Sequence, residues 1–485
     1  MAPVPQRGPV CLEKPPRSIH WPATRSSVAA RGRVRWLRRD LPTISLRVLG
    51  AISGLSMNWF VLRTLGMEQA GRFYVGIIFL GFASILGRGG LDAVLVRRLA
   101  AKRSDHDRDR TSQVSKLAVE EADRREIDAI VLFVVACAFA SALVVMAFWR
   151  VVRYTMEDQP WVANYGDAID AATILLPSVT VLHVFGLAWQ GLGFAKLHIA
   201  TIFLTLSSTT IACCVLGPLL QIITADDLIN HIAMIIYPIT AAAAAAWCCM
   251  GHRWSMISRS HIVSISIEAF DLFGVAVATL INRYLGQLLL VAFVAAEAIA
   301  AYSVIERTAA VIGFLLLVAD ALALPRFASL HGQTRYDQLR DQLRRYNLAI
   351  LAAATPIAFG LFVWAEPVLH YLHPDLTGHA VLLRILVVGQ CFNAATGTIN
   401  TYLVATQRGR AYRNATLMGT VAAAIVGLIL IPTLGLVGAA FAAAASQILS
   451  NTAAAIVVHR VHSGLASNPV GVRTTAACLP NPSGP

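Results

Sequence analysis

Charged side chains inside long apolar stretches are the residues of this sequence most able to do chemistry. Glu306 and Arg307 lie within the apolar stretch 298–322, and Arg283 lies within the stretch 267–290. A charge at the centre of a bilayer costs at least about 2.5–3.5 kcal/mol, so such residues are functional candidates. Arginine suits phosphate groups because its forked donors bind phosphate oxygens bidentately. These residue types indicate an anion-binding site with acids beside it.

The stretch 267–290 concentrates polar residues on one side of the helix that it predicts. At 100° per residue these residues fall within about 120° of arc. A helix facing lipid would not concentrate polar groups in this way, so we predict a role at a cavity or between two halves of the protein. The two acids near the start of the stretch have a second interpretation, contact with interfacial water. The residues are Glu268, Asp271, Thr279, Asn282, Arg283 and Gly286.

The first apolar stretch, 41–62, carries a narrower polar stripe. Arg47, Gly54 and Asn58 fall within about 20° of one another on a helix, as expected of a cavity-lining face. Arg47 has an alternative, because a long side chain near the end of a span can snorkel to lipid headgroups.

Glu306 and Arg307 point in different directions on a helix. Glu306 shares a face about 40° wide with Tyr302, Gly313 and Asp320, whereas Arg307 points roughly 100° away. We therefore expect that the two do not both face one cavity, and that one pairs with a neighbouring helix, for example through Arg283. The predicted substrate-binding residues are Arg47, Asn58, Asn282, Arg283 and Arg307, and the predicted coupling-ion residues are Glu268, Asp271 and Glu306.

The elements that carry these residues are transmembrane helices. The chain is 56% hydrophobic and only 14% charged, with a mean hydropathy of +0.63, whereas soluble domains have about 25% charged residues. Apolar runs of about 20 residues recur, and in lipid such runs become helices. We predict an all-α integral membrane protein of about twelve spans, at 41–62, 70–90, 129–150, 168–190, 198–222, 231–251, 267–290, 298–322, 347–365, 380–403, 414–433 and 437–459.

The net charge of +13 is distributed as a topology signal. Alternate connections carry most of the 40 Lys and Arg residues, while the opposite set carries only Arg63, Arg72, Arg150 and Arg153. The positive-inside rule then places both termini in the cytoplasm, and no nucleic-acid partner is expected.

Five segments follow from this arrangement. They are a basic, disordered cytoplasmic arm at 1–40, a first six-helix lobe at 41–251 with a charged cytoplasmic insert near 100–128, a cytoplasmic loop at 252–266, a second six-helix lobe at 267–459, and a cytoplasmic tail at 460–485. The arm has no apolar core of a cleavable signal peptide.

Motifs of enzymes are missing from the sequence. It has no GxxxxGK[ST] phosphate loop, no HExxH and no cysteine pair with metal-ligand spacing. We expect no enzyme activity, no cofactor and no metal. A membrane-embedded enzyme acting on a sugar-lipid donor is kept as an alternative.

Several segments, in their order and spacing, resemble the oligosaccharide flippases of the polysaccharide transporter family, within the multidrug/oligosaccharidyl-lipid/polysaccharide superfamily. The resemblance covers roughly residues 41–460. It implies two six-helix lobes facing each other across a central cavity that opens alternately to either side. The segments are Leu65-Gly66 to Phe73-Tyr74, Gly89-Gly90-Leu91 to Arg97-Arg98, Ala301-Tyr302 to Arg307, Leu324-Pro325-Arg326-Phe327-Ala328, and Ile431-Pro432 to Ala439-Ala440.

The resemblance implies a flippase that moves a lipid-linked oligosaccharide across the bacterial inner membrane for exopolysaccharide, capsule or O-antigen synthesis. Its partners would be the polyprenyl-pyrophosphate-linked sugar, membrane lipids and polymerase or export machinery. The sister branch of the superfamily, cation-coupled exporters of drugs or metabolites, would fit the same fold and remains the alternative.

Overall fold

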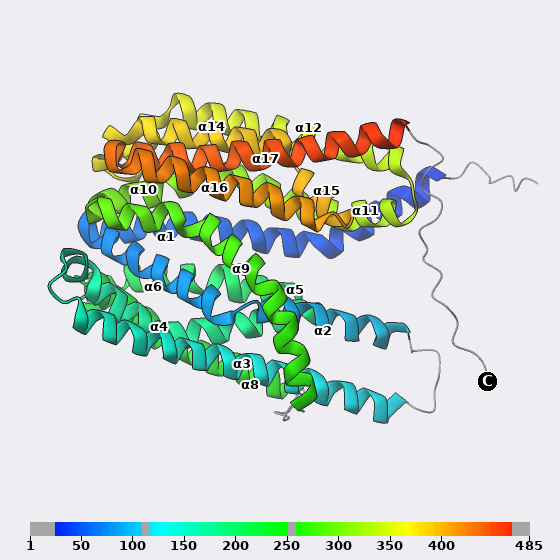
Figure 1. Ribbon diagram of the computed structural model, residues 1–485, viewed down its shortest axis with the longest axis horizontal. Coiled ribbons are helices and arrows are strands. Elements are labelled where there is room, and N and C mark those ends of the chain that lie inside the picture. The colour runs from blue at the N-terminus through cyan, green and yellow to red at the C-terminus, as the bar shows by residue number, and fades with distance from the viewer. Residues whose placement is uncertain (1–24, 109–115, 251–258, 468–485) are drawn as a thin grey trace, which may run out of the picture.

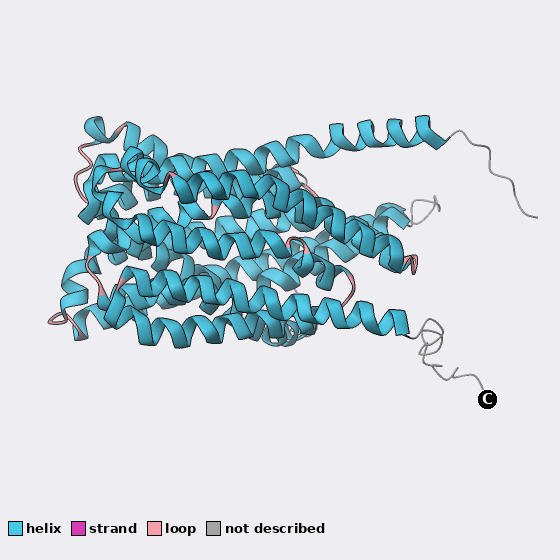
Figure 2. Ribbon diagram, turned by 90° about the horizontal axis from the view of Figure 1, so that it is seen from above, coloured by secondary structure: helices cyan, strands magenta, loops and turns pink. Residues whose placement is uncertain are grey.

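The computed structural model describes residues 25–108, 116–250 and 259–467, and these residues form helices without a strand. Most of the helices lie along the long axis of the molecule and form two bundles, and α9 crosses obliquely between them (Figures 1 and 2). Of the helices in the described residues, ten are long and apolar enough to cross a membrane. The prediction of an all-α membrane protein is confirmed.

The first bundle contains the helices up to residue 249. They are α1 (Arg25–Arg88), α2 (Leu91–Arg108), α3 (Lys116–Thr155), α4 (Pro160–Gly191), α5 (Ala195–Ile199), the π-helical turn η2 (Ala200–Leu204), α6 (Thr205–Val215), α7 (Gly217–Leu220) and α8 (Ala225–Cys249).

The second bundle follows in the chain. It contains α9 (Arg259–Phe293), α10 (Ala296–Ala309), α11 (Val311–Gly332), α12 (Tyr336–Val363), α13 (Ala365–Leu372), the 3-10 helix η3 (Pro374–His379), α14 (Ala380–Thr396), α15 (Ile399–Ala405), α16 (Gly409–Leu434) and α17 (Leu436–Ser467).

Two segments account for the difference between the ten helices and the twelve expected spans. The long apolar segment Ser45–Arg88 contains two of the expected spans, because the chain turns back at Gly66, where φ is 73° (Figure 1). Glycine adopts this conformation without a Cβ penalty. The expected span 267–290 lies within α9. Each of the twelve expected spans thus corresponds to a helical segment.

Two expected boundaries differ from the structure. The N-terminal arm, expected to be disordered over 1–40, is helical from Arg25 onward, because its Ala and Arg residues are good helix formers. The expected loop 252–266 is helical from Arg259, where α9 begins.

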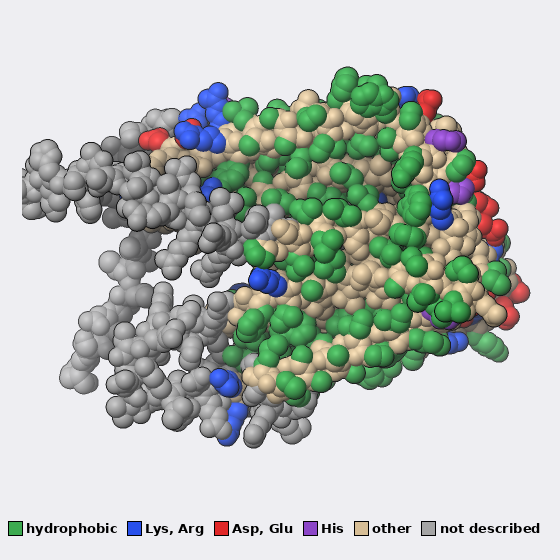
Figure 3. All heavy atoms as spheres, turned by 180° about the vertical axis from the view of Figure 1, so that it is seen from behind, with side chains coloured by type: hydrophobic (Ala, Val, Ile, Leu, Met, Phe, Trp, Pro, Cys, Tyr) green, Lys and Arg blue, Asp and Glu red, His purple; other side chains and the backbone are tan. Residues whose placement is uncertain are grey.

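Charge divides the two ends of the bundles (Figure 3). We call the end where α2 finishes and α12 begins the Arg-rich end, and the end where α3 meets α4 the acidic end. The Arg-rich end carries Arg97, Arg98, Arg124, Arg344, Arg408 and Arg460, and the acidic end carries Glu157, Asp158, Asp226, Glu366 and Asp375.

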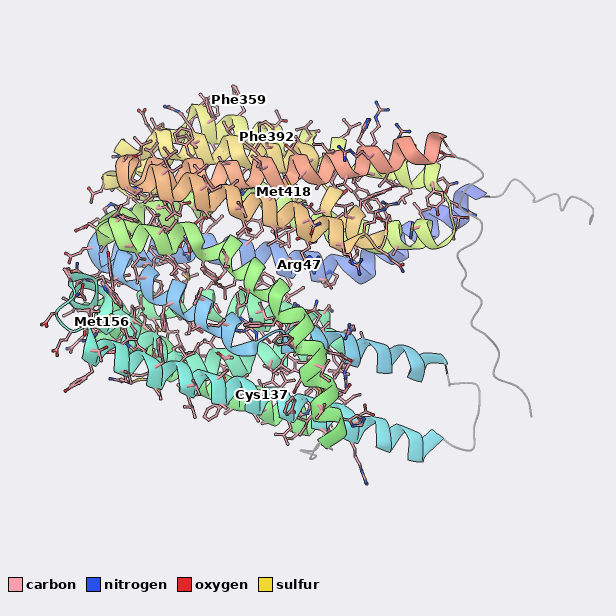
Figure 4. The ribbon with its side chains drawn as sticks, in the orientation of Figure 1. Arg47, Cys137, Met156, Phe359, Phe392 and Met418 are labelled. Atoms are coloured by element: carbon pink, nitrogen blue, oxygen red, sulfur yellow. The ribbon has the colours of Figure 1, made fainter. Side chains whose placement is uncertain are left out.

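The sides of the molecule expose large apolar side chains. Phe359 on α12 is 63% exposed and Met418 on α16 is 53% exposed (Figure 4). An exterior of this kind matches the hydrocarbon of a bilayer. Small residues let neighbouring helices approach closely. At Gly389 an added Cβ would lie only 3.0 Å from the Ala444 Cα.

Candidate functional site

A cavity of about 580 Å³ lies between the two bundles. The first bundle contributes α1, α2, α4, η2 and α6, and the second contributes α9, α10 and α14. Its lining mixes apolar surface with ionisable and amide side chains, as a cavity for a polar solute requires. The polar lining residues are Ser84, Arg88, Asp92, His183, Tyr284, Gln287, Glu306, Arg307 and Gln390.

Arg307 reaches from α10 in the second bundle to α1 in the first. Its Nη1 donates to the Asn58 Oδ1, and its guanidinium carbon lies 4.8 Å from the centroid of the Tyr74 ring. Such a stack attracts a cation to the aromatic face. Among the described residues no carboxylate pairs with Arg307. The guanidinium therefore keeps donors for an anionic solute.

A buried hydrogen-bonded pair holds this arginine in place. Tyr74 is 0% and Asn58 is 2% exposed. The Tyr74 hydroxyl donates to the Asn58 Oδ1 over 3.0 Å, and the Asn58 Nδ2 donates to the carbonyl oxygen of Gly54 over 2.9 Å. The amide oxygen is thus aimed at Arg307 by both of its neighbours. Asn58 lies behind the cavity wall and orients Arg307.

Glu306 lines the same cavity as Arg307. Gln287 on α9 donates from Nε2 to the Glu306 Oε2 over 2.7 Å. The expectation that these two side chains cannot both face one cavity is wrong. Helix α10 lies where the bundles meet, so the cavity borders more than one of its faces, and the long arginine side chain adds reach.

Three lining residues at the Arg-rich side were missed by sequence reasoning. The Arg88 Nη1 donates to the Ser84 Oγ over 2.6 Å, and the Arg88 Nε lies 3.6 Å from the Asp92 Oδ2. Arg88 is only 7% exposed. Its spacing of four residues from both Ser84 and Asp92 is the sequence signal of a polar helix face.

Two other predicted residues lie away from the cavity. Arg47 is on α1 between the bundles (Figure 4), where its Nη1 donates a long hydrogen bond of 3.5 Å to the Leu317 carbonyl oxygen of α11. Glu268 is at the Arg-rich end and pairs with Arg97 and Arg98 of α2. The side chains of Asp271, Asn282 and Arg283 lie outside the described residues.

A second pocket, of about 360 Å³, adjoins the cavity and is apolar throughout. Its walls come from α1, α3, α4 and α9 and include Trp149 and Trp161. Ile78 lines both the pocket and the cavity. Phe148, another wall residue, is 67% exposed on the side of the molecule. The pocket therefore reaches the outer apolar surface and lies beside the polar cavity, with Ile78 in the wall that the two share.

Solved structures of transporters share this architecture. The lipid II flippase MurJ in an inward closed conformation superposes with a TM-score of 0.60 and 14% identity over 86% of this chain and 87% of that chain. An inward-facing multidrug resistance MATE family transporter superposes with a TM-score of 0.59 and 13% identity over 87% of this chain and 99% of that chain. For a MOP superfamily transporter from Pyrococcus furiosus the TM-score is 0.56 and the identity 14%, over 89% of this chain and 96% of that chain.

Family comparisons agree with the fold. The family model described as Polysaccharide biosynthesis protein matches residues 43–331, and the one described as MatE matches residues 273–433. No curated protein is similar enough in sequence to match.

Two helix bundles around a polar cavity are a fold that this chain shares with solved transporters. The family model described as Polysaccharide biosynthesis protein covers more than half of the chain. The chain belongs to the polysaccharide biosynthesis protein family.

Proposed function

We propose that this protein is a flippase that moves a polyprenyl-pyrophosphate-linked oligosaccharide across the bacterial inner membrane, for exopolysaccharide, capsule or O-antigen synthesis. The observation that carries the proposal is the pair of adjoining sites, one polar and one apolar, that share Ile78. A lipid-linked sugar needs both. A wholly soluble solute would need only the cavity.

The cavity suits the head group because it supplies cations to a pyrophosphate. Arg307 offers donors without a carboxylate partner among the described residues, and Arg88 lies on the same lining. Hydrogen bonds of this charged kind contribute about 1.5–3 kcal/mol each. Amide groups such as Gln287 and Gln390 would meet sugar hydroxyls.

The apolar pocket suits the start of the polyprenyl chain. α9 contributes Tyr284 and Gln287 to the cavity and then Leu288 and Val291 to the pocket. One helix thus offers polar and apolar positions in succession. The tail would remain in hydrocarbon while the head crosses in the cavity, which opens alternately to either side.

Orientation and coupling complete the proposal. The Arg-rich end faces the cytoplasm, following the positive-inside rule, and both termini lie there. Glu306 is the acid placed at the cavity, and it is the first candidate for a coupling proton or cation. Polymerase or export proteins of the same pathway would take up the flipped product.

The test uses purified protein in liposomes that contain a polyprenyl-pyrophosphate oligosaccharide with a labelled sugar. Exposure of the sugar to an enzyme added outside reports flipping. We expect Arg307→Ala to slow flipping at least about 10-fold, since about 2 kcal/mol of phosphate binding is lost. The control is Arg63→Ala, because Arg63 stacks on Trp59 at 4.5 Å and does not line the cavity.

Two results would overturn the proposal. One is equal flipping by wild type and Arg307→Ala. The other is transport of a cationic drug driven by an ion gradient with no movement of the lipid-linked sugar, which would identify a drug or metabolite exporter instead.

A further inference from the structure

A third pocket, of about 340 Å³, lies in the second bundle between α12, α14 and α17. It shares no lining residue with the inter-bundle cavity or with the apolar pocket beside it. Its lining residues are Arg340, Leu343, Arg344, Asn347, Leu348, Leu351, Ala395, Ala455, Val458 and His459.

One end of this pocket is basic. Arg340 and Arg344 lie one turn apart near the start of α12, and His459 lies near the end of α17. The start of α12 and the end of α17 are both at the Arg-rich end (Figure 1). No carboxylate is among the lining residues, and neither arginine makes an ion pair with any residue of the described chain. Two unpaired guanidinium groups at one rim favour a phosphate.

The other end of the pocket is apolar and faces hydrocarbon. Leu351 is eleven residues beyond Arg340, roughly 16 Å along the helix. Leu348 is 56% and Leu351 39% exposed, within a helix long and apolar enough to span a membrane. A soluble anion at the rim would leave this wall uncovered, whereas a lipid would cover it with an acyl chain.

A hydrogen bond between α12 and the chain after α14 fixes the middle of the pocket. The Asn347 Oδ1 accepts from the backbone nitrogen of Thr398 over 2.9 Å, at the break between α14 and α15, where Gly397 has φ +61. A Cβ on Gly397 would lie 2.4 Å from that oxygen. The amide is thereby fixed at the boundary between the basic rim and the apolar wall.

We propose that this pocket binds one anionic phospholipid, with its phosphate between Arg340 and Arg344 and an acyl chain along Leu348 and Leu351. A zwitterionic lipid fits less well, because its ammonium or choline group would meet a rim that carries positive charge only. The site is separate from the transport cavity, and it does not depend on which substrate the cavity carries.

The experiment is native mass spectrometry of the full-length protein, titrated with phosphatidylglycerol or phosphatidylcholine. Wild type is expected to retain one phosphatidylglycerol at least about 10-fold more tightly than phosphatidylcholine. The double variant Arg340→Ala/Arg344→Ala should lose this preference. The matched control is Arg345→Ala on the same helix, since Arg345 pairs with Asp341 at 2.8 Å and does not line the pocket.

A double lysine variant is measured beside the double alanine variant, in case the latter does not fold. Arg340→Lys/Arg344→Lys keeps the charge and should retain only part of the preference, because the forked donors are gone. An unchanged preference in the double alanine variant would overturn the proposal. So would full displacement of phosphatidylglycerol by millimolar inorganic phosphate, which would make this a soluble-anion site, or equal retention of phosphatidylcholine.

Discussion

Asn58 is a single acceptor that serves two donors at the boundary between the bundles. The Tyr74 hydroxyl and the Arg307 guanidinium both donate to its Oδ1. The tyrosine is fully buried, and Asn58 is the acceptor that the structure gives its hydroxyl. The residue connects the stability of α1 to the position of the cation in the cavity.

We predict that Asn58→Ala lowers the free energy of unfolding by about 1–3 kcal/mol, because a buried hydroxyl loses its acceptor. Tyr74→Phe alone should cost about 1 kcal/mol. Unfolding by titration with a denaturing detergent would measure both.

The double variant tests whether the two effects share one cause. In the Asn58→Ala background, Tyr74→Phe should cost less than it does alone, since the hydroxyl then has no acceptor to lose. Simple addition of the two single effects would show that the hydrogen bond contributes nothing to stability.

Sequence reasoning found the residues of the cavity that stand out against an apolar background. Arg307 and Glu306 interrupt a run of apolar residues, so their cost in lipid marks them. Arg88 does not stand out, because it sits near other arginines that set topology. Tyr284, Gln287 and Gln390 carry no charge, and only the packing of the helices brings them to one cavity.

At the scale of elements, glycine positions set how closely the two bundles approach. Gly71 in the second half of α1 faces the start of α10, and an added Cβ would lie 1.9 Å from the Ala296 carbonyl oxygen. Backbone cannot yield as a flexible side chain can. Close approach of the bundles at the acidic end thus requires a residue without a Cβ at position 71.

We predict that Gly71→Ala separates α1 from α10 at the acidic end and costs about 1–3 kcal/mol of stability, as overpacking does. Distances between spin labels on the two helices would measure the separation. Gly54→Ala is the matched control, because nothing lies within 4 Å of its added Cβ, and its effect should stay within about 0.5 kcal/mol. Equal distances in wild type and Gly71→Ala would contradict the prediction.

The spans themselves were predictable because lipid leaves an apolar run no structure other than a helix. Breaks inside spans were harder to predict. The π-helical turn at 200–204 and the step between α10 and α11 near Ala310 depend on what each segment packs against. Their sequences carry no strong breaker such as a Pro–Gly pair.

At the scale of the whole molecule, α9 joins the two bundles along its length (Figure 1). Glu268 near its start pairs with Arg98 of α2 at 2.7 Å, while Leu289 near its end lies against Gly427 of α16. A helix with this path contacts both bundles. Its first third and the middle of α2 form a charged contact between the bundles near the Arg-rich end.

Sequence periodicity gave Glu268 two interpretations, a cavity residue or a group in interfacial water. The structure places it instead in an ion pair between bundles. That contact joins residues about 170 positions apart. No local pattern specifies it, because it depends on the bend of α9 across the molecule.

Glu268 therefore offers a test of alternating access at one end of the molecule. Its carboxylate is 31% exposed and accepts from both Arg97 and Arg98. Partly exposed ion pairs contribute about 0.2–1 kcal/mol each, so loss of both should shift a two-state equilibrium several-fold. We predict that Glu268→Gln increases the fraction of molecules open at the Arg-rich end.

The measurement is the distance distribution between spin labels on α2 and α9 in lipid nanodiscs, with labels at exposed positions away from the pair. Glu268→Gln should move population toward longer distances, and raising the salt concentration should do the same in wild type, because salt screens exposed charges. Glu366→Gln is the matched control. Its carboxylate pairs with Arg384 at 3.7 Å inside the second bundle at the acidic end, so the α2 to α9 distances should stay as in wild type. Identical distributions in Glu268→Gln and wild type would mean that the bundles are held together at this end by packing, with no contribution from the ion pair.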